Sequence, residues 1–129
     1  MRLAVFSDIH ANFEALHAVV ADFQDQQIDR YICLGDLIGY GANPNECIEL
    51  VRSLPNVIVL LGNHDAAATW GTTPFGMSKA AQKVIFWSME ILTEKNLSFI
   101  KGLEATRVMG DMIFSHANPY NPKAWRYVN

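Results

Sequence analysis

The sequence predicts an α/β fold in which short parallel strands alternate with amphipathic helices. Three short apolar runs lie in the first half of the chain, and the first two are each followed by apolar residues at helical spacing. All three runs lead into Asp, Asn or His side chains. The chain has 129 residues, of which 50% are hydrophobic, so it can bury a core and we expect one domain over residues 1–129.

The first apolar run, residues 3–6, is typical of a strand that is covered on both faces. Asn12 can cap the helix that follows, because apolar side chains then recur three and four residues apart as far as Phe23. His17 lies within this helix, away from other ligand-type residues, and we do not expect it to contribute to a site.

Asp8 and His10 come directly after this strand. Residues i and i+2 of an extended backbone point to the same side, so the two side chains can reach one cation. A carboxylate paired with an imidazole suits Mn, Fe, Zn, Co or Ni better than Ca. The alternative is that Asp8 only caps the next helix.

The second apolar run, residues 31–34, leads into Asp36 within a glycine-rich loop. Ligands of open parallel sheets bind outside the carboxyl ends of the strands, so Asp36 is expected to face the same crevice as the first strand end. Asn43 and Pro44 then predict the start of a second helix, which Pro55 ends.

The third apolar run, residues 57–61, leads into Gly62-Asn63-His64-Asp65. Capping alone does not explain this motif, because Asp65 could cap the next helix without the Asn-His pair. The recurrence of ligand-type residues after three strands therefore favours a site over helix capping.

The second half of the chain predicts further helices and a hairpin. Residues 71–76 are rich in Gly, Thr and Pro and predict either an ordered loop near the site or a mobile flap, and in both cases we expect this stretch to shape specificity. Ser78 is expected to cap the longest helix, in which Phe86 and Trp87 are interpreted as packing residues and not as a surface for stacking a substrate.

Asn96 is expected to cap a short helix that runs through Leu103. Residues 106–109 and 112–115 then predict a β-hairpin with a two-residue turn. The second of these strands leads into His116, so a fourth strand ends in a ligand-type residue.

Composition excludes several classes of function. The net charge of −3 and the absence of a Lys/Arg cluster argue against a nucleic-acid surface and favour a small-molecule partner. The first apolar run is too short for a membrane span and lacks the pattern of a signal peptide, so we expect a cytoplasmic protein without a membrane partner. Cys33 and Cys47 lie in segments expected to be buried, and they are interpreted as reduced core thiols.

Four motifs at the strand ends together resemble the calcineurin-like metallophosphoesterase family, in its smaller bacterial phosphodiesterase branch. In order, the motifs are Asp8-x-His10, Gly35-Asp36-x-x-Gly39, Gly62-Asn63-His64-Asp65 and Ser115-His116. The resemblance covers essentially the whole chain. It implies an α/β/β/α sandwich, with two sheets inside and helices outside, and a site for two metals at the strand ends.

The resemblance also implies a role for each residue of the site. Asp8 and His10 would bind the first metal, Asp36 would bridge both metals, and Asn63 and His116 would bind the second. His64 would be catalytic, contacting the phosphoryl group or protonating the leaving oxygen. The expected cofactors are two divalent transition metals, manganese before iron, zinc, nickel or cobalt.

One feature of the family is missing. Its members normally carry a Gly-His-x-His motif downstream of Ser-His, whose histidines complete both metal sites, but all four histidines of this chain are already placed. The second sheet should also be short of strands and leave an open, apolar surface. Three explanations stay open: the N-terminal part of a longer domain, a homo-oligomer that covers the open sheet, or a degenerate family member. We favour the first, because every metal-site residue that could be present in this chain is intact.

The resulting expectation for function is a metal-dependent phosphoesterase. It would hydrolyse small phosphodiesters or phosphomonoesters with a hydroxide that two metals activate. The alternative is a truncated or degenerate, non-catalytic interaction protein on the same scaffold.

Overall fold

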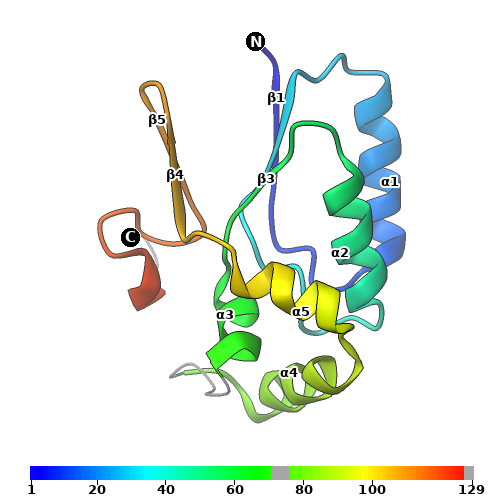
Figure 1. Cartoon of the computed structure of the whole chain (residues 1–129), viewed down its shortest axis with the longest axis vertical. Coiled ribbons are helices and arrows are strands. Elements are labelled where there is room, and N and C mark those ends of the chain that lie inside the picture. The colour runs from blue at the N-terminus through cyan, green and yellow to red at the C-terminus, as the bar shows by residue number, and fades with distance from the viewer. Residues whose placement is uncertain (71–75, 127–129) are drawn as a thin grey trace.

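A computed structural model of the chain describes residues 1–70 and 76–126 (Figure 1). Its elements in chain order are β1 (Leu3–Phe6), α1 (Phe13–Gln24), β2 (Arg30–Cys33), α2 (Pro44–Ser53), β3 (Ile58–Val59), α3 (Asn63–Trp70), α4 (Lys79–Ile91), α5 (Glu94–Lys101), β4 (Thr106–Met109), β5 (Met112–Ser115) and the 3₁₀ helix η1 (Pro122–Ala124).

The first sheet is parallel and has the strand order β1-β2-β3. Ile32 of β2 lies opposite Val5 on one side and Ile58 on the other. Parallel neighbours need a crossover, and α1 and α2 supply the two crossovers. The mixed α/β class expected from the sequence is therefore confirmed, and all three carboxyl ends of the strands lie at one edge.

Strand β3 is shorter than the five residues that the apolar run predicts. Leu60 forms an isolated parallel bridge with Glu104, and the backbone N–H of Leu61 donates to the Glu104 carbonyl at 2.8 Å. The end of the run therefore pairs with the segment that leads into the hairpin, and this pairing links the two sheets.

Side-chain caps begin two of the helices as expected. The Asn12 side chain accepts from the backbone N–H of Ala15, and Ser78 accepts from that of Ala81. The prediction for α5 is wrong: Thr93 is its cap, and Asn96 lies buried inside the helix. Thr93 fills the cap position three residues earlier, which leaves the Asn96 amide free to donate to another side chain at 2.9 Å.

The core lies between the parallel sheet and the helices. Helices α1 and α2 lie on one side of the sheet and the β4-β5 hairpin lies on the other (Figure 1). Ile32, Ile48 and Ile85 are fully or almost fully buried. Cys33 and Cys47 are also buried, and both are free thiols, as expected.

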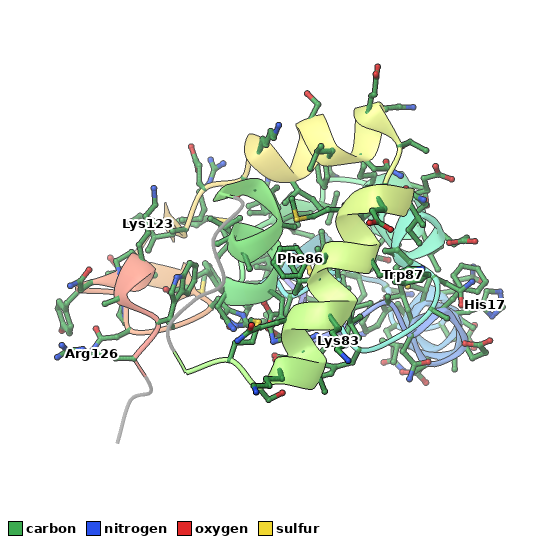
Figure 2. All side chains as sticks on the ribbon, turned by 90° about the horizontal axis from the view of Figure 1, so that it is seen from below. His17, Lys83, Phe86, Trp87, Lys123 and Arg126 are labelled. Carbon is green, nitrogen blue, oxygen red and sulfur yellow. The ribbon has the colours of Figure 1, made fainter. Side chains whose placement is uncertain are left out.

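Helix α4 buries a narrower face than the sequence suggested. Its buried residues are Ala81, Ile85 and Ser88, whereas Phe86 and Trp87 are 49% and 39% exposed (Figure 2). Successive residues of a helix are turned by about 100°, so the two aromatic residues that follow Ile85 point away from its buried stripe. Both aromatic side chains are therefore partly exposed and lie outside the buried stripe of the helix.

The second sheet is the two-stranded hairpin of β4 and β5, with Met109 opposite Met112 across the turn. Val108 and Ile113 form a cross-strand pair and are 65% and 60% exposed. The second sheet is therefore small, with apolar residues open to solvent. Within the described part of the chain, no helix has the length and apolar character needed to cross a membrane.

Candidate metal centre

The loops after β1 and β2 stay paired beyond the ends of the strands. The backbone N–H groups of Asp8 and His10 donate to the carbonyls of Gly35 and Asp36, at 3.0 and 2.9 Å. Asp8, His10 and Asp36 all have positive φ, between 48° and 56°. The two N-terminal ligand candidates therefore meet through a left-handed loop, and not through the extended backbone that the sequence suggested.

Asp36 lies at the middle of the cluster. Its Oδ2 is 3.7 Å from His10 Nε2 and 3.5 Å from His116 Nε2, while its Oδ1 accepts the backbone N–H of His64 at 2.9 Å. One carboxylate oxygen thus faces imidazoles from two sides, and the other is fixed by the start of α3. A Cβ on Gly62 would collide with this carboxylate, which explains the glycine before Asn63.

Residues from the hairpin and from α3 complete the cluster. His116 follows β5, and its Nε2 lies 3.0 Å from Asn63 Oδ1 at the start of α3. On the other side, Asp8 Oδ1 lies 3.7 Å from His10 Nε2. The structure therefore brings together all five residues that the sequence analysis named as metal ligands.

His64 lies beside this cluster. Its ring is 4.7 Å from the ring of His10, and its Nδ1 is buried without a hydrogen-bond partner among the described residues. Gly39, with φ at +95°, leaves room for this nitrogen, because a Cβ there would collide with it. Burial, followed by the neighbouring His10 and His116, lowers the pKa of His64 to about 4.

Asp65 is a structural residue that the sequence analysis assigned to helix capping. It is fully buried, and its carboxylate accepts the backbone N–H groups of Asp36, Leu37, Ile38 and Gly62 at 2.8 to 3.3 Å. It therefore ties the loop after β2 to the start of α3. The only sequence signal was its place in the Gly-Asn-His-Asp motif, since its acceptors come from a distant loop.

Burial also governs the titration of the central carboxylates. It raises the pKa of Asp36 to about 7, and the nearby Asp8 adds to the rise. Burial, and then the charge of Asp36, also raise the pKa of Asp65. A cation beside Asp36 would offset this cost of burying charge, so the site favours positive ligands.

The donor set fits divalent cations. Two groups of side chains hold their potential ligand atoms within 4.8 Å of one another: Asp8, Asp36 and His116 in one, and His10, Asp36 and His64 in the other. The distances near 3.5 Å between potential ligand atoms in this cluster match those between neighbouring ligand atoms of one cation. These are about 3.0–3.6 Å when the metal–ligand bonds are near 2.1 Å long. Carboxylate, imidazole and amide donors suit transition metals.

The cluster opens into a cavity of about 860 Å³, a size that suits a small-molecule ligand. His17 is exposed on α1, where it contacts Phe13, in agreement with its exclusion from the site. The loop expected to shape specificity falls mostly on residues 71–75, which lie outside the described residues.

Fold and site together define an α/β protein with a His/Asp cluster at the carboxyl edge of a parallel sheet. The family profile of calcineurin-like phosphoesterases matches residues 1–125. The chain belongs to this family, whose members use divalent metals.

Relatives share the fold over the whole of the chain. The chain is 42% identical to the protein MJ0912 of Methanocaldococcus jannaschii, and the match covers 98% of this chain and 53% of the relative. It is similar to the crystal structure of a metallophosphoesterase from Sphaerobacter thermophilus, with a TM-score of 0.82 and 35% identity over 99% of this chain and 51% of the other. The chain therefore spans about half the length of these relatives.

A more distant structure supports the fold alone. The protein PH1004 of Pyrococcus horikoshii OT3 has a TM-score of 0.82 at 22% identity, and the match covers 93% of this chain and 56% of the other.

Proposed function

We propose that this chain carries the catalytic site of a metal-dependent phosphoesterase that hydrolyses phosphodiesters or phosphomonoesters. The observation that carries the proposal is the position of Asp36 Oδ2, which faces His10 and His116 at 3.7 and 3.5 Å. A single carboxylate between two sets of nitrogen and oxygen donors suits a pair of cations. Membership of a phosphoesterase family supports the reaction class.

In this proposal each protein group has one task. Asp8 and His10 would hold the first cation, Asn63 and His116 would hold the second, and Asp36 would serve both. Two bound cations supply Lewis acidity for the phosphoryl oxygens and lower the pKa of a water molecule. Manganese is the cation we expect first, before iron, zinc, nickel or cobalt.

In this proposal His64 is not a metal ligand and acts as the general acid. Its low pKa keeps the imidazole neutral in the free site. An anionic phosphoester bound beside it would raise this pKa again, because a nearby negative charge favours the imidazolium. His64 could then donate a proton to the departing oxygen.

We also propose that these 129 residues are the N-terminal part of a longer domain. The relatives are about twice as long as the matched region, and the second sheet has two strands among the described residues. Further ligands from such a segment would complete the metal sites. The cytoplasmic location expected from the sequence stays a prediction.

The first experiment measures metal per chain by elemental analysis after manganese loading and desalting, beside hydrolysis of bis(p-nitrophenyl) phosphate. About two metals per chain with turnover would support the proposal. Absence of both metal and turnover would contradict the proposal that this chain carries a working site, and would leave an inactive fragment of a longer domain or a non-catalytic protein on this scaffold.

A further inference from the structure

Tyr40 stands at the edge of the candidate metal centre in an unusual conformation. It follows Gly39, has φ at +59° and is 61% exposed. Bulky residues rarely adopt positive φ, and such outliers cluster at functional sites. Tyr40 thus places a large, mostly exposed aromatic side chain at the edge of the site.

The ring of Tyr40 covers two histidines of the site. Its centroid is 4.7 Å from that of His10, in an edge-on arrangement, and 4.9 Å from that of His64. Tyr40 lines the cavity of about 860 Å³ and also a second cavity of about 550 Å³, which likewise includes Asp8 and His10 in its lining. The exposed part of the ring therefore borders the space that a substrate would fill.

The cavity has a mostly polar lining that includes a few large apolar and aromatic side chains. The ligand candidates gather around Asp36, whereas Tyr40, Met77 and Trp125 contribute apolar and aromatic surface elsewhere in the lining. Trp125 comes from the C-terminal side of η1 and lies 6.3 Å, between ring centroids, from His116. Two aromatic side chains from distant segments thus border the same cavity, each beside a histidine of the site.

We infer that the substrate is a phosphoester with a planar aromatic group, such as a nucleobase, and that this group stacks on the Tyr40 ring. The inference rests on the proposed function, because it places the phosphoryl group at the metal centre. Aromatic rings bind planar groups by offset stacking, which any nucleobase can provide. The cavity of about 860 Å³ has room for a nucleotide.

The test compares two ligands that differ only in the aromatic group. Binding of AMP and of ribose 5-phosphate to the manganese-loaded 129-residue chain is measured by isothermal titration calorimetry. We expect AMP to bind about tenfold more tightly, and we expect Tyr40→Leu to abolish most of this preference. Tyr40→Phe should keep it, since the ring remains.

Phe86→Leu is the matched control, because Phe86 is also an exposed aromatic residue but lies on α4 outside the cavity lining (Figure 2). It should leave the preference unchanged. Equal binding of the two ligands by an active chain would overturn the inference while the proposed function stands. Loss of the preference in Tyr40→Phe would overturn stacking and assign the contact to the hydroxyl. A chain that binds neither metal nor either phosphate would overturn both proposals.

Discussion

Asp36 shows how much of the site depends on single side chains. One of its oxygens is held by the backbone of α3, and the other faces His10 and His116. The carboxylate is almost fully buried, so its charge is costly unless a cation lies beside it. Burial therefore disfavours the charged carboxylate of Asp36 in the free site, and a bound cation would stabilise it.

Asp36→Asn is expected to weaken the binding of both cations, because the amide carries no charge and replaces one carboxylate oxygen by a donor. Manganese bound per chain, measured by elemental analysis, should fall well below that of the unchanged protein. Asp111→Asn, in the exposed turn of the hairpin, is the control and should bind as before. Full occupancy in Asp36→Asn would refute the bridging role.

His64→Ala is expected to lower turnover by about 10²–10⁴-fold, the usual contribution of a general acid. Metal content should stay nearly unchanged, because the proposed ligands are intact. His17→Ala removes an exposed histidine of α1 and should affect neither quantity. Loss of metal from His64→Ala would show instead that His64 is a ligand.

At the scale of elements, the site depends on how the loop after β2 meets the start of α3. Asp65 binds backbone N–H groups from both segments, and Gly62 leaves space for the Asp36 carboxylate. Four buried N–H groups share this one carboxylate. Together with the bond from the backbone N–H of His64 to Asp36 Oδ1, these contacts join the loop to the helix.

Asp65→Asn is expected to lower the free energy of unfolding by roughly 2–4 kcal/mol, because an amide has one acceptor oxygen and brings a donor toward other donors. Urea denaturation followed by circular dichroism measures the change. Asp22→Asn, on the exposed face of α1, should change the free energy by less than about 0.5 kcal/mol. Equal midpoints for both variants would contradict this structural role.

The thiols of β2 and α2 should be inert in the folded chain. Burial raises the pKa of Cys33 and of Cys47 to about 12, so both stay protonated at pH 8. Because the thiol pKa is higher in the folded chain than in the unfolded chain, the neutral thiol contributes to the free energy of unfolding. This contribution is fully present below pH 9 and is lost as the pH rises toward 12.

We expect Ellman's reagent at pH 8 to label neither cysteine in the native chain, and to label both in concentrated urea. Rapid labelling of either thiol without urea would show that β2 or α2 opens easily.

At the scale of the whole molecule, the hairpin is the least covered part. Val108 and Ile113 are mostly exposed on β4 and β5, and the second sheet has no further strand among the described residues. Exposed apolar pairs and open sheet edges favour association. The homo-oligomer that the sequence left open as one explanation would use this surface.

We expect the 129-residue chain to associate with a second copy, so light scattering after size exclusion should give about twice 14.4 kDa at high concentration. Val108→Lys should shift the mass toward the monomer, whereas Val19→Lys, on the exposed face of α1, should not. A mass of 14.4 kDa for the unchanged chain at every concentration would contradict the expectation.

The sequence by itself determined the strands, most of the helices and the identity of the clustered residues. Apolar runs and helical spacing are local properties, so the β1-α1-β2-α2 order and the hairpin could be predicted from them. The motif residues Asp8, Asp36 and His116 were found because each follows a strand. Only the tertiary structure decided how these residues meet.

The left-handed loop of Asp8 and His10, the contacts of Asp65 and the exposure of Phe86 all depend on segments that are distant in the chain. The same holds for the start of α5, where the sequence predicted Asn96 as the cap but the structure places Thr93 there and buries Asn96. Local pattern specifies which elements form, but burial and partner atoms come from long-range packing, which no short stretch of sequence encodes.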